Sequence, residues 1–368
     1  MLNFKENISL SDYTTIKLGG KARYFCECID EEEIIACLNF IRENKLKYQI
    51  LGGGSNTIFP DEGFDGLILK TAMKNINLTG KGGSDEVEVI AEAGVNWDDF
   101  VRFCVAQGFA GIECLSGIPG TVGATPIQNV GAYGQDVSQV IKEVGVIQID
   151  KMNKFKFSNA DCRLGYRDSR FKSEDSNKYI ITEVKFVLKL NGEPLIQYPD
   201  LLKSLNDKNY LLSNDNGKNY LIDIADSKEK LKIVHDAIIE IRKRKGMVTD
   251  GNDPDSISCG SFFTNPILSN DEFTTFKDNC IKKEINNIEI PHFKTDKGIK
   301  VPAAWLIENA GFKNGYRKNG AGISSKHTLA LINCGGKTKD VIELANEICE
   351  KVFELFGIKL ETEPQIIK

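Results

Sequence analysis

The amino-acid sequence predicts a protein of mixed helices and strands made of two or three domains. Its length of 368 residues exceeds that of one ordinary domain and allows cores of normal size. Short runs with strand periodicity recur along the chain, and amphipathic helical patterns lie between them. A third observation is the stretch 113–136, which is too rich in glycine and proline for regular helix or strand. We therefore expect packed domains that hold one long irregular loop in place.

Composition and charge exclude several classes of protein. The chain is 41% hydrophobic and 27% charged. Its formal net charge of −5 lacks the basic excess that is typical of proteins that bind a polyanion such as nucleic acid. No apolar run is long enough for a membrane span, and residues 1–15 lack the basic and apolar regions of a signal peptide. The sequence therefore predicts a cytoplasmic protein with neither nucleic acid nor a membrane as its partner.

Ten cysteines are present, yet their spacing does not predict a metal site. No pair forms C-x-x-C, and no cluster with the three histidines has zinc spacing. Most of them lie inside apolar segments, where a free cysteine behaves as a small buried hydrophobe. We expect reduced thiols, no disulfide and no bound metal.

The first 110 residues contain helices whose ends are marked by capping residues. Asp30 and Glu33 form a capping-box pattern that predicts a helix over 30–44. Asn96 and Gly108 are the start and stop signals of a helix over 97–107. Runs of strand-forming residues predict four further segments, namely 14–29 folded about a Gly19–Gly20 turn, 48–51, 66–70 and 87–91.

Similar patterns predict the elements of the remaining chain. Ser227 opens a helix that Gly246 ends, Pro302 opens a shorter one, and the strongest amphipathic pattern covers 338–356. Residues 191–225 are rich in Asn, Asp and Lys and predict an irregular excursion. The expected strands are 144–149, 154–157, 180–190, 259–266 and 329–333, with a strand-like start to the tail.

The stretch 113–136 carries five glycines and two prolines, but its only charges are at its two ends. It is therefore too apolar for a solvated linker. Glycine lets bare backbone approach a flat or anionic ligand closely, which predicts contact with a cofactor. The alternative is a buried irregular connection that serves only the fold.

Four other segments carry candidate functional residues, each with a plainer alternative. The triple glycine within 51–56 either leaves N–H groups for an anion-binding nest or forms a hairpin turn. The arginines of 162–172 are close to Tyr166 in the sequence, and the segment is either part of a ligand site or a solvated loop. The basic run 242–245 either faces an anionic ligand or merely suits a helix C-terminus. Ser261 is either a reactive hydroxyl or a serine bonded to backbone.

Six motifs occur in an order that resembles one family of flavoenzymes. They are LGGGSNT at 51–57, SGIPGTVGATPIQNVGAYG at 116–134, YRDSRFK at 166–172, GSFFTNP at 260–266, AAWLIENAGFKNG at 303–315 and LETE at 360–363. The second and fourth motifs are the most specific, and the likeness covers nearly the whole chain. The chain resembles the type I UDP-N-acetylenolpyruvoylglucosamine reductases, the UDP-N-acetylmuramate dehydrogenases (MurB family) of bacterial peptidoglycan and cell-wall synthesis.

The resemblance implies an FAD-binding fold of the vanillyl-alcohol-oxidase (PCMH) type in two subdomains, 1–70 and 71–245. A substrate-binding α+β domain over 246–356 is expected next, and the tail 357–368 is expected to return to the FAD domain. Both glycine-rich segments would hold FAD. The residues expected to contact it are Gly52, Gly53, Gly54, Ser55, Asn56, Pro119, Gly120, Thr121, Gly123, Ala124, Gln128, Asn129, Gly131, Ala132 and Tyr133.

The resemblance also implies a reaction and the residues that serve it. NADPH reduces FAD, which then delivers hydride to the enolpyruvyl group of UDP-N-acetylenolpyruvoylglucosamine to give UDP-N-acetylmuramate. Arg167 would stabilise the growing negative charge, and Ser261 would protonate the α-carbon. Glu363 would assist, with Glu361 as the alternative position. Substrate contacts are expected from Tyr166, Tyr198, Lys245, Asn265 and His327.

The sequence departs from the family pattern at two places. Gln365 stands where an arginine is common two residues past the catalytic glutamate, and the loop from Lys245 to Ser261 is longer than usual. The alternative function is that of another FAD-dependent oxidase or dehydrogenase of the same fold, acting on an alcohol or lactone. No histidine precedes His235, which argues against an oxidase that tethers FAD to histidine. As in the family, we expect a monomer.

Overall fold

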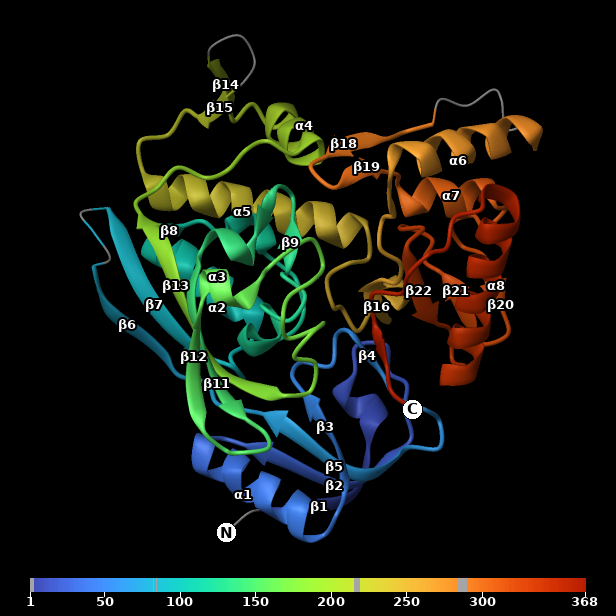
Figure 1. Ribbon diagram of the computed structural model, residues 1–368. Coiled ribbons are helices and arrows are strands. Elements are labelled where there is room, and N and C mark those ends of the chain that lie inside the picture. Colours follow the sequence, from blue (N-terminus) through green and yellow to red (C-terminus); the bar gives the residue numbers. More distant parts are fainter. Residues whose placement is uncertain (1–2, 82, 84, 215–218, 284–289) are drawn as a thin grey trace. The chain divides into compact units, whose positions relative to one another are not determined.

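The computed structural model describes residues 3–81, 83, 85–214, 219–283 and 290–368 (Figure 1). Contacts group the chain into two compact units. Unit 1 consists of Met1–Ile8, Ala22–Gly53 and Asp65–Val248, and unit 2 of Ser9–Lys21, Gly54–Phe64 and Thr249–Lys368. Two short segments near the N-terminus therefore belong with the C-terminal third of the chain. The domain boundaries implied by the resemblance remain a prediction.

The first sheet of unit 1 has the strand order β1-β2-β5-β3, and helix α1 lies along it (Figure 1). Asp30 caps α1 as predicted, because its side chain accepts a hydrogen bond from the Glu33 N–H at 2.8 Å. The elements are β1 (Lys5–Ser9), β2 (Lys21–Cys28), α1 (Glu31–Glu43), β3 (Lys47–Leu51) and β5 (Phe64–Thr71).

The strand expected at the start of 14–29 is not formed, and this prediction was wrong. Residues 10–13 form a 3₁₀ turn, and the Thr14 hydroxyl then donates to the Leu18 carbonyl oxygen at 3.1 Å. Ile16 and Leu18 are buried in the core of unit 2 rather than in a sheet. Ile16 and Leu18 alternate with polar residues, which is the pattern expected of a strand. In the structure this alternation only places two buried side chains on an irregular segment.

The second sheet of unit 1 has the order β12-β11-β13-β7-β6, and β8 pairs with β13. Helix α2 packs on it, with the ring of Phe100 4.9 Å from that of Phe186. Asn96 caps α2 through the Asp99 N–H, and Gly108 ends it in a left-handed conformation, both as predicted. The elements are β6 (Ile76–Lys81), β7 (Glu86–Glu92), α2 (Trp97–Gln107), β8 (Phe109–Ala110), β11 (Ile141–Gln148), β12 (Lys154–Ser158), α3 (Asn159–Cys162) and β13 (Tyr179–Leu190).

The segment 191–225, predicted to be irregular, contains regular structure in its described part. Helix α4 begins at Pro199, whose fixed φ suits a first helical position. Leu201 and Leu205 are buried in one cluster with Val234 and Ile238 of α5, so tertiary packing outweighs the polar composition. Residues 215–218 lie outside the described residues. The elements are α4 (Pro199–Asp207), β14 (Leu211–Asn214), β15 (Asn219–Ile222) and α5 (Ser227–Arg244).

Unit 2 contains a sheet of order β16-β22-β21-β20, a second of order β17-β19-β18, and a parallel pair of β23 with β4. Its core includes Phe262, Phe276 and Phe356 and one face of α8, whose bounds are as predicted. The elements are β4 (Thr57–Ile58), β16 (Ser258–Ser261), β17 (Ile267–Leu268), α6 (Asn270–Lys282), β18 (Phe293–Thr295), β19 (Gly298–Lys300), α7 (Ala303–Asn309), β20 (Arg317–Lys318), β21 (Ala321–Ile323), β22 (Ala330–Asn333), α8 (Thr338–Phe356) and β23 (Gln365–Ile366).

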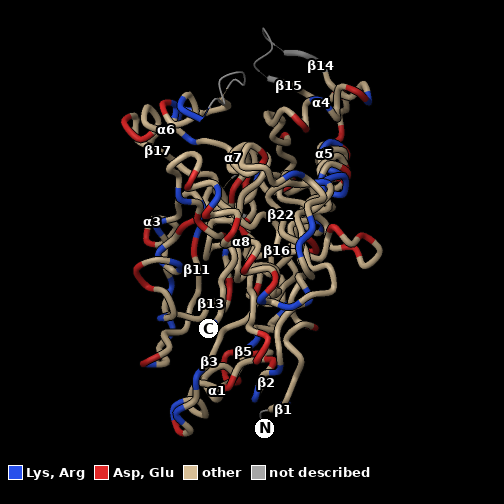
Figure 2. The backbone as a smooth tube through the Cα atoms, turned by 90° about the vertical axis from the view of Figure 1, so that its right-hand side faces the viewer, with Lys and Arg blue, Asp and Glu red and all other residues tan. Residues whose placement is uncertain are grey.

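Charged residues of both signs are interspersed along the backbone (Figure 2). The last turn of α5 is basic, as the helix dipole favours, but Arg242 in that turn is buried rather than solvated. Across the described residues, no helix combines the length and the apolar character needed to cross a membrane.

Candidate functional site

The two glycine-rich segments predicted to hold a cofactor meet within unit 1. A Cβ atom on Gly53 would stand 2.6 Å from the Gly120 Cα, and one on Gly52 would stand 2.8 Å from Thr121 Oγ1. Real Cβ atoms are not found at such distances, so a side chain at either glycine would push the two loops apart. We call these four residues, Gly52, Gly53, Gly120 and Thr121, the glycine cradle.

A buried hydroxyl in the glycine cradle has no hydrogen-bond partner among the residues that the structure describes. Thr121 is 8% exposed, and its Oγ1 is buried without such a partner. An unsatisfied buried polar group costs about 1–3 kcal/mol, so native proteins seldom leave one without a partner or a role. Bare glycine backbone beside an unsatisfied hydroxyl fits a bound group that is rich in acceptors, such as the diphosphate of FAD.

The part of the glycine-rich stretch that follows Thr121 has an uncommon backbone conformation. Its first part is anchored by hydrogen bonds from the Val122 and Gly123 N–H groups to the Val95 and Ala93 carbonyl oxygens, at 2.9 and 3.0 Å. Farther along, Asn129 and Tyr133 have φ values of 46° and 51°. Non-glycine residues seldom adopt positive φ, and such strain concentrates at ligand-binding positions.

The segment 162–172 is attached to this loop by side-chain hydrogen bonds. Asn129 Nδ2 donates to the Gly165 carbonyl oxygen at 3.0 Å, and Arg167 Nη2 donates to the Gly131 carbonyl oxygen at 3.1 Å. The Ser169 hydroxyl donates to the Ile127 carbonyl oxygen at 2.6 Å. The structure therefore brings the predicted catalytic arginine against the predicted cofactor loop.

Arg167 is presented at the corner of a tight turn. Gly165 and Asp168 exchange backbone hydrogen bonds of 2.9 and 3.3 Å, and Arg167 between them has φ of 53°. The guanidinium carbon lies 5.6 Å from the centre of the Tyr166 ring, which is itself 42% exposed. Both residues of the predicted Tyr-Arg pair thus occupy a rigid projecting turn.

Three other predicted residues of unit 1 gather near the start of α4. The Tyr133 and Tyr198 rings pack edge to face with centroids 5.2 Å apart, and Lys245 Nζ lies 5.8 Å from the Tyr133 ring. Lys245 also pairs with Asp200 Oδ2 at 2.6 Å. Burial acts to lower the pKa of Lys245, but Asp200 and Tyr133 outweigh it and raise that pKa above its ordinary value. The ammonium group therefore stays charged at neutral pH.

Two residues of this cluster were missed as site residues by sequence reasoning. Asp200 lies in the segment 191–225 that was expected to be irregular, and Arg242 was one of four basic residues at 242–245 that either faced an anionic ligand or merely suited a helix C-terminus. Arg242 is 6% exposed, its Nη2 donates to the Met247 carbonyl oxygen at 2.8 Å, and a Cβ on Gly117 would stand 3.4 Å from its Nε. Burial lowers the pKa of Arg242, and Tyr133 and Asp98 act against that. The 3.6-residue spacing of Arg242 with Ile238 was the signal for its burial.

In unit 2, a β-bulge determines where Ser261 points. The pairing of β16 with β22 slips between Ser258 and Ser261, and Gly260 in the gap has φ of 74°. Bulges re-aim side chains next to active sites. Ser261 Oγ lies 3.3 Å from Nε2 of His327, so two predicted residues from distant parts of the sequence are neighbours.

The C-terminal tail runs beside the segment that carries Ser261. The Glu363 N–H donates to the Phe262 carbonyl oxygen at 2.9 Å, and Asn56 Nδ2 donates to the Glu363 carbonyl oxygen at 3.2 Å. Glu363 is half-buried, whereas Glu361 is exposed. The choice of Glu363 over Glu361 as the catalytic glutamate remains a prediction.

The remaining predicted residues of unit 2 have structural contacts of their own. Asn265 Oδ1 accepts a hydrogen bond from the Ala303 N–H at 2.8 Å and so holds the first turn of α7. Gly54 has φ of 65°, and a Cβ there would stand 1.9 Å from the Tyr13 carbonyl oxygen. Arg167 belongs to unit 1, while Ser261 and Glu363 belong to unit 2.

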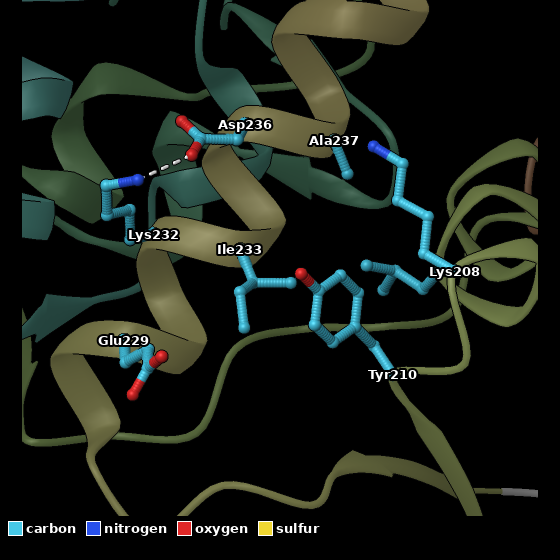
Figure 3. A pocket seen from close by; sticks show the side chains of 8 residues that line it. Lys208, Tyr210, Glu229, Lys232, Ile233, Asp236 and Ala237 are labelled. Atoms are coloured by element: carbon cyan, nitrogen blue, oxygen red, sulfur yellow. Dashed lines mark hydrogen bonds and ion pairs between the residues drawn. The ribbon is translucent and has the colours of Figure 1, made fainter.

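A hollow of about 300 Å³ lies between α4 and α5 of unit 1 (Figure 3). Tyr210 and Ile233 form its apolar side, and Lys232 and Asp236 pair on the other side at 2.8 Å. None of the predicted site residues lines it. Its lining residues are Leu205, Lys208, Tyr210, Glu229, Lys232, Ile233, Asp236 and Ala237.

Comparison with known proteins identifies both parts of the chain. Residues 253–367 match the C-terminal domain of UDP-N-acetylenolpyruvoylglucosamine reductase, and residues 22–150 match an FAD binding domain. The UDP-N-acetylenolpyruvoylglucosamine reductase of Thermobifida fusca is 42% identical over 369 residues, which cover 99% of this chain and 98% of that protein. The reductase of Mycobacterium tuberculosis is 35% identical over 375 residues, which cover 98% and 95%.

A solved structure supports the same assignment at the level of fold. The crystal structure of UDP-N-acetylenolpyruvylglucosamine reductase from Thermus caldophilus aligns over the full length of both chains with a TM-score of 0.66 and 21% identity. Together with the FAD-binding match, this confirms the predicted α+β fold, an FAD-binding part followed by a further α+β domain. The chain belongs to the UDP-N-acetylenolpyruvoylglucosamine reductase family.

Proposed function

We propose that the chain reduces UDP-N-acetylenolpyruvoylglucosamine to UDP-N-acetylmuramate, with FAD as bound cofactor and NADPH as reductant. The observation that carries this proposal is the likeness to named reductases along the whole chain, at 42% identity over 99% of its residues. The reaction would supply a precursor of peptidoglycan.

The glycine cradle is proposed to hold FAD. FAD, when bound, supplies the hydride. The backbone at Gly52, Gly53 and Gly120 would approach the cofactor without interference from side chains, and the Thr121 hydroxyl would donate to one of its acceptor oxygens. That hydrogen bond would satisfy a group that has no partner among the described residues.

Arg167 is proposed to bind the substrate carboxylate. A guanidinium group is permanently charged and presents a planar fork of donors that matches a carboxylate. Hydride addition to the enolpyruvyl group places negative charge next to that carboxylate, and a fixed cation stabilises such charge as it develops. The hydrogen bond to Gly131 and the rigid turn hold the cation in advance, so little reorganisation is needed.

Ser261 is proposed to donate the proton that completes the reduction. A serine hydroxyl is a weak acid, so it must lie close to an electron-rich carbon and be held in one orientation. His327, with Nε2 3.3 Å from the hydroxyl oxygen, would hold that oxygen by donating a hydrogen bond to it while the hydroxyl proton passes to the substrate. Glu363, beside the neighbouring Phe262, would assist by hydrogen bonding to the substrate.

Tyr198 and Lys245 are proposed to bind the diphosphate of the substrate. Lys245 is a charged donor held by Asp200, and Tyr198 is 41% exposed at the start of α4. A cation and a hydroxyl on adjacent elements provide charge-assisted hydrogen bonds to phosphate oxygens. The nearby Arg242 adds a second, buried positive charge.

The test is a two-step absorbance experiment without oxygen. NADPH added to the purified yellow protein should remove the flavin absorbance, and UDP-N-acetylenolpyruvoylglucosamine added next should restore it, with UDP-N-acetylmuramate found by mass spectrometry. Restoration by oxygen alone, with no product from the enolpyruvyl substrate, would instead indicate an oxidase acting on an alcohol or lactone. Parallel runs with NADH determine which nicotinamide is the reductant.

We further propose that the enzyme works as a monomer in the cytoplasm, where NADPH and nucleotide sugars are available. Light scattering on the purified FAD-loaded protein should give the mass of one chain. A mass of two chains at micromolar concentration would contradict this.

A further inference from the structure

Three cysteines meet between the first sheet of unit 1 and the helix that lies along it. Cys26 and Cys28 are two residues apart on β2, so their side chains point to the same face, and Cys37 is on α1. All three are buried, with exposed fractions of 2%, 0% and 0%. Their sulfur atoms lie within 4.8 Å of one another, and those of Cys28 and Cys37 are 3.5 Å apart. We call these residues the cysteine cluster.

The sulfur separations fit a metal ion at the centre of the triangle. A thiolate sulfur lies about 2.3 Å from such an ion, which requires sulfur atoms roughly 4.0 Å apart in a planar three-coordinate site. The 3.5 Å between the Cys28 and Cys37 sulfur atoms and the upper limit of 4.8 Å on all three separations are compatible with this geometry. Cys26 and Cys28 are fixed by β2, and Cys37 is fixed by the middle of α1.

We propose that Cys26, Cys28 and Cys37 form a binding site for a soft monovalent metal ion of the copper(I) class. The donor set is three sulfur atoms, which select soft ions. Zinc in a structural site takes four ligands, and among the described residues no His, Asp or Glu adds a ligand atom to this group. Each thiol that becomes a thiolate ligand releases one proton. A bound ion would join α1 to β2, and this inference does not depend on the proposed function.

The test uses the reduced, full-length, FAD-loaded protein without oxygen. Copper(I) is added as its acetonitrile complex, excess is removed with a competing chelator, and copper per chain is measured. Every sample carries Cys334→Ser, because Cys334 is exposed and would bind copper adventitiously. Cys37→Ala and Cys26→Ala remove one ligand each from two different elements. Cys104→Ala is the matched control, since Cys104 is also a fully buried cysteine on a helix.

The background protein and Cys104→Ala should each retain one copper ion more than either cluster variant. Losing one of three donors should weaken retention by at least about tenfold, since even outer-shell changes have such effects. X-ray absorption should show sulfur neighbours only, and copper should raise the thermal unfolding midpoint of the background protein but not of the cluster variants.

Equal copper in all variants, nitrogen or oxygen neighbours, or tighter binding of zinc(II) than of copper(I) would overturn the proposal. Flavin absorbance and metal-free unfolding check that each variant is folded, and two separate cluster variants keep the result interpretable if one is not.

Discussion

Arg167 Nη2 donates a hydrogen bond to the carbonyl oxygen of Gly131 at 3.1 Å. This bond joins the turn that presents the guanidinium to the loop that is proposed to contact the cofactor. The partner is a backbone oxygen, so this bond orients the guanidinium through a neutral group. A cation prepared in this way suits a reaction in which negative charge develops on the substrate.

We expect Arg167→Lys to slow the proposed reduction of the enolpyruvyl substrate by about 10²- to 10³-fold, the loss typical of removing one donor to a developing anion. Lysine keeps the charge but loses the planar fork. The measurement is the rate at which flavin absorbance returns after substrate is added to NADPH-reduced enzyme. Arg163→Lys is the matched control, since Arg163 also has positive φ but pairs with Glu174 at the surface. Equal rates for both variants would contradict the role of Arg167.

We expect Ser261→Ala to separate the two half-reactions. NADPH should bleach the flavin at the normal rate, while the enolpyruvyl substrate should restore it about 10²- to 10⁴-fold more slowly, the usual contribution of a positioned proton donor. Ser227→Ala removes an exposed hydroxyl that bonds to the Asn191 carbonyl oxygen and serves as the control. If the second half-reaction of Ser261→Ala ran at its normal speed, another group would be the proton donor.

The two tail glutamates should differ in their effect. Glu363→Gln should slow the substrate half-reaction by at least about tenfold, because an acidic group close to the reacting centre is lost. Glu361→Gln should change it little, since Glu361 is exposed and only its backbone oxygen is used, at 3.0 Å from the Thr264 nitrogen. Steady-state kcat for the two variants decides between them, and the reverse order would transfer the role to Glu361.

Tyr198→Phe should weaken substrate binding and leave the chemical step intact. Phenylalanine preserves the edge-to-face packing on Tyr133 but cannot bond to a phosphate oxygen. Loss of one hydrogen bond to a charged group should raise KM by about 10- to 100-fold. Tyr210→Phe, a similarly exposed tyrosine in the hollow between α4 and α5, should leave KM unchanged. A normal KM with a collapsed kcat would refute the binding role.

Thr121→Val should have opposite effects on the FAD-free protein and on the complex. Removing a hydroxyl that has no partner in the described part of the chain should leave the unfolding midpoint of the FAD-free protein unchanged or higher, whereas FAD should bind about tenfold or more weakly. Thr125→Val is the control, because the Thr125 hydroxyl already donates to the Val122 carbonyl oxygen at 2.8 Å. It should destabilise the FAD-free protein. Unchanged FAD affinity in Thr121→Val, measured by flavin fluorescence, would remove Thr121 from the cofactor site.

Local signals in the sequence were reliable where the structure depends on local physics. Asp30, Asn96 and Gly108 mark helix ends because each bonds to or terminates its own helix, and these predictions are confirmed. The loop over 113–136 is irregular as its glycines require, apart from short 3₁₀ turns and a two-residue hairpin pairing.

The features that sequence reasoning missed depend on contacts between distant residues. The helix α4 forms because Leu201 and Leu205 find a partner surface on α5. The sequence spacing of Cys26, Cys28 and Cys37 does not match a zinc motif. Two of these cysteines are on a strand and one is on a helix, so their sulfur atoms come together only through the packing of α1. The burial of Arg242 was not predicted, because it depends on how α5 is covered.

The make-up of unit 2 has a consequence for synthesis of the chain on the ribosome. Ile16, Leu18 and Ile58 belong to its core, yet they emerge long before the residues that surround them. The parallel pair of β23 with β4 joins Gln365–Ile366 to Thr57–Ile58, so it forms only after both segments have been synthesised (Figure 1). Such distant pairings are slow to form and leave apolar segments exposed in the meantime. A fragment that begins at Thr249 would lack Ile16, Leu18 and Ile58, so unit 2 needs its two N-terminal segments as well as the residues that follow Thr249.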